Sequence, residues 1–221
     1  MKKILLVCTL LVVFLCTTCA QNEIKIKLSD PVLDGKVSIE KVLNERRSVR
    51  AYKDTPLTEQ NLSQLLWAGQ GITDKASKKR TAPSARAKYP IELYMVVFNV
   101  EGIERGVYLY VPDGHEIVKV FGDEKHADII KAAGSQPSVS KCAAAFIIAG
   151  NYKKMSENYN EQAILFTHTE VGHVSQNIAL QGVALNIGSV VLGGFQPDNM
   201  AKLFDFPEHI RPVYVMPVGN N

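Results

Sequence analysis

The spacing of hydrophobic residues predicts two helices in the first third of the chain. Leu62, Leu65 and Leu66 lie on one face of a helix that begins at Thr58, a residue type common at helix N-termini. Ser38 is a second capping residue and precedes a shorter amphipathic stretch. Residues 73–80 are hydrophilic and lack any period, so we interpret them as a mobile, solvated loop in preference to a lid over a site.

Runs of β-branched and aromatic residues predict the strands. Residues 91–98 form one such run, and residues 106–111 and 116–120 form a hairpin around a Pro-Asp-Gly turn. Residues 143–149 are small and apolar throughout, which is typical of a buried strand. Residues 160–185 are hydrophobic on most faces, so they predict a long helix that is buried in the core or against another subunit.

The last third of the chain continues to mix strands with short helices. We expect a strand over residues 189–192, a helix over residues 198–203 and a strand over residues 213–218. The elements do not follow the regular strand–helix–strand rhythm of a doubly wound sheet. The pattern therefore predicts one α+β domain over residues 37–221, after a loose polar lead-in over residues 21–36.

The first 20 residues have the character of an export signal. Lys2 and Lys3 precede an apolar run over residues 4–15, which is shorter than the roughly 18–20 residues needed to span a bilayer. Small residues follow this run, as they do at signal-peptide cleavage sites. We therefore interpret residues 1–20 as a signal peptide and expect an exported, periplasmic protein.

The cysteines support this division of the chain. Cys16 and Cys19 lie in the predicted signal, where a lipid anchor is the alternative to cleavage. Leu15 and Thr18 precede them, whereas lipid attachment favours a small residue there, so we favour cleavage. Only Cys142 remains in the mature chain, which excludes an intrachain disulfide and predicts a buried, inert thiol.

The charge balance excludes several classes of function. The chain holds 25 Lys and Arg against 22 Asp and Glu, and removal of Lys2 and Lys3 leaves a net charge of +1. A nearly neutral domain lacks the basic surface that nucleic-acid binding requires. The mature sequence has no second apolar run long enough for a membrane span. It also lacks a P-loop, a dinucleotide-binding glycine motif and a nucleophile elbow.

The densest candidate site is a run of basic residues near the start of the domain. Arg46, Arg47, Ser48 and Arg50 place three guanidinium groups and a hydroxyl within five residues. Guanidinium groups match phosphate oxygens bidentately, so this run could bind a phosphate. Alternatively, the run is only a solvated basic surface, or its cations compensate the C-terminal end of the preceding helix.

Two further segments could approach a planar ligand with their backbone. Pro83, Ser84 and Ala85 belong to a loop of small residues that is bracketed by prolines and leads into a strand. Gly193 and Gly194 follow an expected strand, and their lack of a Cβ permits close approach of a ring. Read alone, the first segment is more simply a strand lead-in, and the Gly-Gly pair is more simply a turn.

Two histidines on the predicted long helix raise the possibility of a metal site. His168 and His173 are five residues apart, whereas helical zinc ligands are spaced by four. The mature chain has no cysteine cluster to complete such a site, so we expect no metal. We interpret Glu170 as an internal hydrogen-bonding group of the same helix.

Taken together, the ordered motifs resemble those of the nitroreductase superfamily of FMN flavoproteins, and most closely the SagB-type dehydrogenases that oxidise azolines. The resemblance covers residues 37–219. The motifs are Arg-Arg-Ser-Val-Arg at 46–50, Leu-Leu-Trp-Ala-Gly-Gln-Gly at 65–71, Thr-Ala-Pro-Ser-Ala at 81–85, Gly-Val-Tyr-Leu-Tyr at 106–110, Gly-His-Val-Ser-Gln-Asn at 172–177 and Val-Leu-Gly-Gly-Phe at 191–195.

The resemblance implies a three-layer α+β fold with a mostly antiparallel central sheet, and an intertwined homodimer with FMN sites at its interface. By position, Arg46, Arg47 and Ser48 match the contacts of the family to the phosphate and ribityl chain, and Arg50 matches a cation near the flavin pyrimidine. The loop of the family that flanks the isoalloxazine is matched by Pro83, Ser84 and Ala85. The backbone near flavin N5 is matched by Gly193 and Gly194. We name no general acid or base, because the flavin performs the redox step in this family.

The loop after Ala85 departs from the SagB pattern. Arg86 and Lys88 stand where glycine and leucine are usual, which adds charge beside the expected flavin and could add a phosphate or carboxylate contact. No Lys or Arg follows the last expected strand, so phosphate binding is expected to depend on residues 46–50.

The sequence therefore predicts an FMN-dependent oxidoreductase acting on a small or peptide-derived substrate. A flavin-binding or flavin-scavenging protein without turnover is the alternative, and a metal-dependent hydrolase is a distant third. Because NAD(P)H is scarce outside the cytoplasm, export would favour substrate oxidation, or reduction fed by another electron donor.

Overall fold

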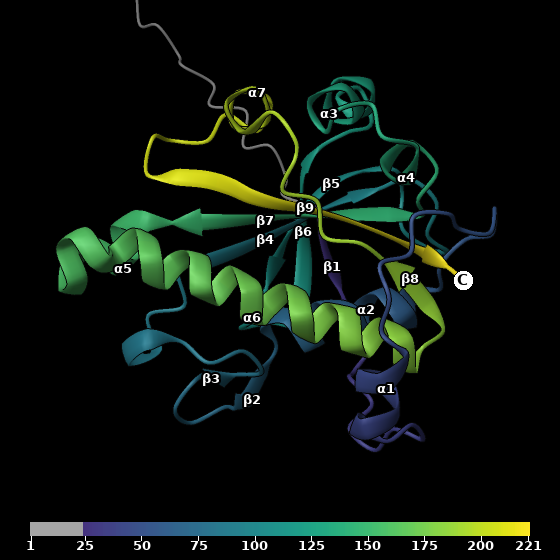
Figure 1. Cartoon of the computed structure of the whole chain (residues 1–221), viewed down its shortest axis with the longest axis horizontal. Coiled ribbons are helices and arrows are strands. Elements are labelled where there is room, and N and C mark those ends of the chain that lie inside the picture. The colour runs from purple at the N-terminus through teal and green to yellow at the C-terminus, as the bar shows by residue number, and fades with distance from the viewer. Residues whose placement is uncertain (1–23) are drawn as a thin grey trace, which may run out of the picture.

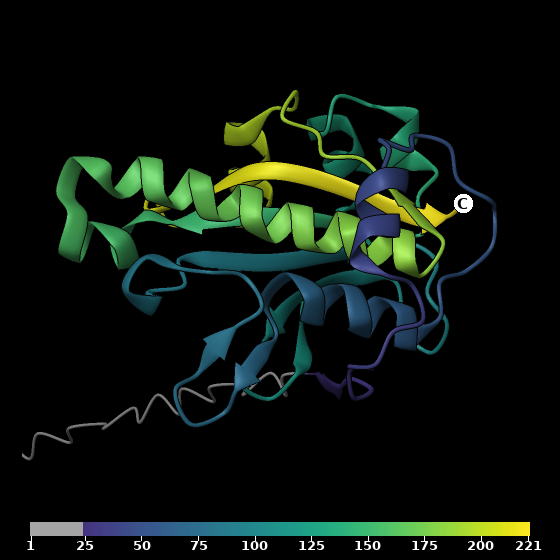
Figure 2. The same ribbon diagram turned by 60° about the horizontal axis from the view of Figure 1, so that its bottom comes forward.

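The computed structural model describes residues 24–221, so the predicted signal peptide lies outside the described residues. Within this range, a seven-stranded sheet with the order β1-β6-β5-β4-β7-β9-β8 separates two layers of helices (Figures 1 and 2). Every neighbouring pair in this sheet is antiparallel. This arrangement confirms the predicted three-layer α+β fold with its antiparallel sheet.

The strands of the large sheet vary from three to eleven residues. They are β1 (Lys25–Lys27), β4 (Ile91–Val97), β5 (Gly106–Val111), β6 (Glu116–Phe121), β7 (Ala144–Asn151), β8 (Ile187–Ser189) and β9 (Ile210–Asn220). The helices are α1 (Ile39–Glu45), α2 (Glu59–Gln70), α3 (His126–Ala132), α4 (Pro137–Ser140), α5 (Tyr152–Tyr159), α6 (Ala163–Ala184) and α7 (Pro197–Leu203), with 3₁₀ turns η1 (Ala85–Ala87) and η2 (Asn160–Gln162).

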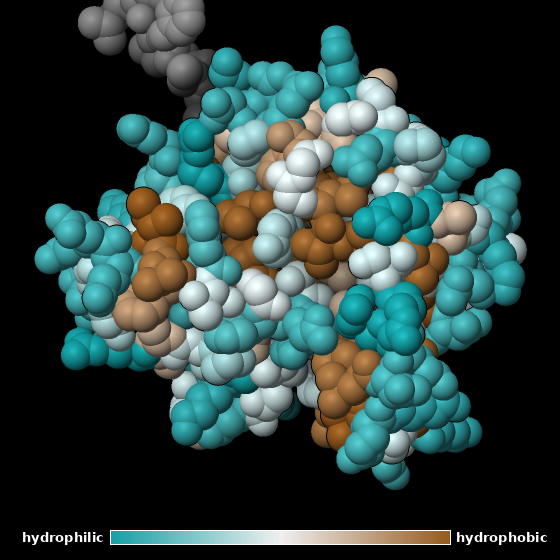
Figure 3. Space-filling model, in the orientation of Figure 1, coloured by the Kyte–Doolittle hydropathy of each residue, from teal (hydrophilic) through white to brown (hydrophobic). Residues whose placement is uncertain are grey.

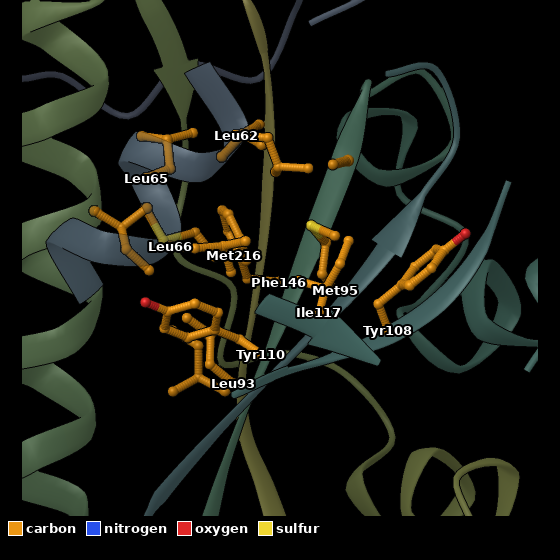
Figure 4. Packing of buried hydrophobic residues seen from close by; sticks show 14 of the residues in the cluster. Leu62, Leu65, Leu66, Leu93, Met95, Tyr108, Tyr110, Ile117, Phe146 and Met216 are labelled. Atoms are coloured by element: carbon orange, nitrogen blue, oxygen red, sulfur yellow. The ribbon is translucent and has the colours of Figure 1, made fainter. Parts of the chain in front are cut away.

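Helices α2 and α6 cover one face of the sheet. Leu62 and Leu66 of α2 are fully buried against Met95 of β4 and Phe146 of β7, in the cluster drawn in Figure 4. Gly69 permits the close approach of the two helices, because a Cβ at this position would lie 3.0 Å from the Ile178 side chain of α6. The leucine pattern of the sequence thus packs α2 beside α6 on this face of the sheet.

Helices α3, α4 and α7 cover the opposite face, at the top of Figure 1. Side chains alternate between the two layers along each strand, so Val96 points to this second cluster while its neighbour Met95 points to the first. Cys142 is buried in the second cluster and its thiol donates to the Val139 carbonyl at 3.1 Å. Burial raises the pKa of this thiol to about 12, as expected for an inert cysteine.

The long helix agrees closely with its prediction. It occupies Ala163–Ala184, and η2 precedes it. Asn186 follows the helix with a φ of 58°, a left-handed conformation that asparagine tolerates. None of the helices within residues 24–221 is both long and apolar enough to cross a membrane.

Two polar segments are more ordered than their composition indicates. The lead-in over residues 21–36 contains β1, which pairs with β6 at the sheet edge, and Leu28 beyond it is 2% exposed. Residues 73–80, predicted as a loop without structure, form most of a small hairpin of β2 (Ile72–Asp74) and β3 (Lys79–Arg80). In both segments, backbone pairing with a neighbour outweighs the low hydrophobicity of the side chains.

Candidate functional site

The arginine run of residues 46–50 lies along the edge of the sheet formed by β8. The Val49 amide donates to the Ser189 carbonyl at 2.9 Å, which continues the sheet by one bond. Gly188 allows this contact, because a Cβ there would lie only 2.6 Å from Val49. Tyr52 donates from its hydroxyl to the Val49 carbonyl at 3.0 Å and closes the segment. The backbone of the run is therefore held by the packing and hydrogen bonds of Val49, without use of the charged side chains.

The four residues of this run that are predicted to contact the flavin differ in what their side chains do. Arg47 donates from Nη1 to the carbonyls of Asn44 and Arg46 at 2.9 and 2.8 Å. Its side chain therefore binds backbone carbonyls at the C-terminal end of α1. Within the described part of the chain, the side chains of Arg46, Ser48 and Arg50 make no hydrogen bond or ion pair. The compensation of a helix end thus accounts for one arginine, while the other two and the serine remain available to a ligand.

The loop of Pro83, Ser84 and Ala85 is tied to the middle of α6. The carboxylate oxygen Oε1 of Glu170 accepts from the Ser84 hydroxyl and from the Ala85 amide, both at 2.9 Å. Ser84 Oγ in turn accepts from the Tyr89 amide at 2.8 Å. Glu170 is only 4% exposed, and burial raises the pKa of its carboxyl, although the two bonds partly oppose this. The interpretation of Glu170 as an internal hydrogen-bonding group is confirmed.

This loop also stores backbone strain. Arg86, Ala87 and Tyr89 have φ values of 51°, 52° and 47°, a left-handed region that costs about 1–2 kcal/mol per non-glycine residue. Such strain persists only where surrounding contacts impose it, and it gathers at ligand sites. The Glu170 anchor is the main such contact within this loop.

The two cations that depart from the SagB pattern engage α5. Arg86 donates from Nη1 to Asn158 Oδ1 at 3.4 Å, and Lys88 lies 3.5 Å from a carboxylate oxygen of Glu157. Both partners are exposed residues of α5. The added charges therefore fasten the loop to a neighbouring helix.

Gly193 and Gly194 lie past β8, beside the middle of β9. A Cβ at Gly193 would have Tyr214 as its nearest neighbour at 3.7 Å, and a Cβ at Gly194 would meet nothing within 4 Å. Neither residue has a positive φ. Both glycines are exposed, so packing within this chain does not require them, and the free space is available to a ligand or a second subunit.

One chain does not bring the arginine run and the loop of residues 83–85 together. The loop is bound to Glu170, whereas the run lies beside β8, which follows the C-terminal end of α6. At about 1.5 Å per residue, the helix from Glu170 to Ala184 separates them by roughly 20 Å. Figure 1 shows α1 and β3, the elements next to these segments, at different positions along α6.

The possibility of a metal site raised by the sequence concerns the two histidines of α6. His168 and His173 are exposed, and His168 Nε2 lies 2.7 Å from the Tyr152 hydroxyl. Among residues 24–221, no three His, Cys, Asp or Glu side chains are grouped so that they could hold a metal ion.

Comparison with known proteins identifies the family. Residues 43–220 match the sequence profile of the Nitroreductase family. A Methanocaldococcus jannaschii protein named as the nitroreductase MJ1384 is 39% identical over 184 residues, which cover 83% of this chain and 91% of that protein.

Two solved structures share the fold. A nitroreductase structure from Ralstonia eutropha JMP134 superposes with a TM-score of 0.78 at 24% identity, over 89% of both chains. The NADPH:FMN oxidoreductase of Vibrio harveyi, solved with NAD⁺, gives a TM-score of 0.60 at 17% identity, over 82% of this chain and 68% of the other.

Proposed function

We propose that this chain, which belongs to the nitroreductase family of oxidoreductases, binds FMN and uses it to oxidise or reduce a small or peptide-derived substrate. The observation that carries the proposal is that most side chains of the predicted phosphate-binding run are not used in bonds within the described chain. The side chains of Arg46, Ser48 and Arg50 make no hydrogen bond or ion pair with the described residues, and the exposed glycines at 193 and 194 leave open space. Phosphate and a flat ring are the two ligand parts that fit these features.

Different residues are assigned to different parts of the flavin. Arg46 and Ser48 are assigned to the phosphate, Arg50 to the flavin pyrimidine edge, and Pro83, Ser84 and Ala85 to the face or rim of the ring. The bound flavin supplies hydride transfer at N5. A fixed guanidinium near the pyrimidine stabilises the negative charge that reduction places there, which is the expected role of Arg50.

We further propose that the complete site forms in a homodimer. The separation of the two predicted halves along α6 requires a second copy if both contact the same flavin. Figure 3 shows hydrophobic surface over α1 and over the start of α6, where Ile39, Leu43, Ile164 and Leu165 are all more than half exposed. Exposed apolar patches of this kind are typical of subunit interfaces. Light scattering during size exclusion tests this proposal, and a monomer that binds flavin fully contradicts it.

The cofactor assignment is tested with purified protein. We expect a yellow protein with flavin absorption and an Arg46→Ala/Arg50→Ala double variant that binds FMN at least tenfold more weakly. Arg105→Ala serves as the control, because Arg105 is an exposed arginine outside the predicted site that pairs with Asp123. Unchanged FMN affinity in the double variant refutes the arginine assignment, and a protein that takes up no FMN refutes the function.

Turnover distinguishes an enzyme from a flavin-binding protein. Bleaching of the flavin by a reductant, followed by re-oxidation with a nitroaromatic, a quinone or an azoline, supports the oxidoreductase. A flavin that binds but exchanges electrons with none of these acceptors supports the scavenging alternative. The set of accepted substrates also tests the SagB-type assignment, which predicts azoline oxidation.

The location of the protein is a separate proposal that depends on residues 1–20. We propose export to the periplasm with cleavage after Ala20, in which case electrons come from the substrate or from a donor other than NAD(P)H. Cell fractionation and the mass of the mature N-terminus test it. A protein retained in the cytoplasm with Met1 in place contradicts it, and a lipid-modified Cys16 or Cys19 would select the anchored alternative.

A further inference from the structure

A pocket lies next to the loop of residues 83–89, where Arg80 contacts Tyr89. It has a volume of about 250 Å³ and opens between the ends of α2, β3 and β5 and the start of β4, with α5 alongside. Ile91, Leu93 and Leu109 contribute hydrophobic surface, and Arg80, Glu92 and Lys154 contribute charge. The pocket is large enough for a small organic molecule with one charged group.

Arg80 is the unusual group of this pocket. Its guanidinium donates from Nη1 to Gln70 Oε1 at 2.6 Å and stands 4.6 Å from the centre of the Tyr89 ring. Within residues 24–221, no carboxylate lies within ion-pair distance of it. The residue is half-buried, and burial lowers the pKa of its guanidinium. Its direct contacts, Gln70 and Tyr89, are neutral, and a partly desolvated cation is stabilised further by an anion in direct contact.

The acidic groups nearby are already committed to other partners. Glu92 accepts from Asn151 Nδ2 at 2.8 Å and from the Tyr94 hydroxyl at 3.0 Å, and its carboxylate also pairs with Lys154 at 3.6 Å. Asp113, at the turn beyond β5, pairs with Lys78. Glu170 and Asp113 act on Arg80 only from beyond ion-pair distance, and Glu170 already accepts from Ser84 and Ala85. The Arg80 guanidinium therefore has no direct carboxylate partner among the described residues.

We propose that this pocket binds a small carboxylate, with Arg80 as the group that recognises it. The guanidinium keeps donors beyond the one used by Gln70, and its fork matches the two oxygens of a carboxylate. The hydrophobic walls receive the body of the ligand. The Tyr89 hydroxyl accepts from the Arg80 amide at 3.1 Å, so the pocket is joined to the loop that is predicted to flank the flavin.

The identity of this carboxylate as the substrate rests on the proposed function, whereas its binding does not. If the flavin lies against residues 83–85, a ligand held by Arg80 is close enough to that loop to be the electron donor or acceptor. The pocket then selects substrates that carry a carboxylate, and neutral analogues bind more weakly.

Isothermal titration of the full mature chain tests the binding. The probes are 4-nitrobenzoate and its neutral analogue 4-nitrobenzamide, which have similar shape and differ in charge. We expect the carboxylate to bind about tenfold more tightly than the amide, as one charge-assisted bond provides. This preference should diminish with added salt, disappear in Arg80→Gln and persist in the control Arg105→Gln.

Several outcomes overturn the proposal. Equal affinities of the wild-type protein for the two probes would do so without any variant, as would a preference that Arg80→Gln retains. If Arg80→Gln fails to fold by circular dichroism, Arg80→Lys replaces it, since lysine keeps the charge and removes the fork. A reduced but measurable preference is then expected, and an unchanged one contradicts recognition by the guanidinium.

The same samples separate failure of the pocket from failure of the proposed function. A protein that binds FMN and fails to discriminate the probes refutes the pocket and leaves the flavin assignment intact. A protein that discriminates the probes and takes up no FMN refutes the flavin assignment and keeps the carboxylate site.

Discussion

The two segments predicted to contact the flavin are held in place by opposite means. The arginine run of residues 46–50 is fixed through its backbone by close packing on Gly188 and by the bond from Val49 to Ser189. The loop of residues 83–89 is fixed by a buried side chain, the carboxylate of Glu170. In the run, Arg46, Ser48 and Arg50 therefore make no hydrogen bond or ion pair with the described residues, while in the loop the backbone conformation depends on Glu170.

The largest expected effect comes from removal of the side-chain anchor. Glu170→Ala leaves the Ser84 hydroxyl and the Ala85 amide without their acceptor, and we expect a loss of about 3 kcal/mol in the free energy of unfolding. Urea denaturation measures this loss. Glu170→Gln, which keeps an acceptor oxygen, is the control and should lose less. Equal losses in the two variants would show that the loop does not depend on these hydrogen bonds.

A smaller effect is expected when the close packing of the run is disturbed. Gly188→Ala places a Cβ 2.6 Å from Val49 and should cost about 2 kcal/mol, while it also moves Arg46 and Arg50 and weakens FMN binding. Gly35→Ala is the control, because a Cβ at Gly35 meets nothing within 4 Å. Normal FMN affinity in Gly188→Ala would mean that the position of the run is unimportant for binding.

The pH dependence of stability tests the state of the buried anchor. Because burial raises the pKa of Glu170, the native protein holds this proton more tightly than the unfolded chain does. The contribution of Glu170 is fully present below the unfolded pKa of about 4.3 and declines as pH rises through the native pKa. Wild type should therefore lose stability relative to Glu170→Gln as pH rises from 4 to 8. Parallel pH profiles in urea denaturation would exclude such a shift.

The smallest effect concerns the strain within the loop. Ala87 is exposed with a φ of 52°, so Ala87→Gly should relieve strain and raise the free energy of unfolding by about 0.5–1 kcal/mol. Thermal unfolding can resolve a change of this size. Ala127→Gly, at an exposed position inside α3, is the matched control and should lower stability. A loss of stability in Ala87→Gly would indicate that the left-handed backbone is not strained.

Much of the fold could be predicted because it depends on near neighbours along the chain. The leucines of α2, the apolar surface of α6, the hairpin of β5 and β6 and the left-handed Asn186 each follow from patterns within a few residues. β1 and the β2–β3 hairpin could not be predicted, because their order comes from pairing partners and their side chains are polar. The pairing of β1 with β6 joins residues about ninety positions apart, and local pattern contains no information about it.

The candidate site divides in the same way. The sequence by itself determined which residue types were available: three arginines and a serine able to bind phosphate, a loop of small residues, and a pair of glycines. Only the tertiary structure decided that Arg47 serves a helix end, that Glu170 holds a loop 85 residues away, and that Arg80 lies half-buried without a carboxylate beside it. The reason is physical: the chemistry of a side chain is fixed by its identity, whereas its burial and partners are fixed by packing between distant segments.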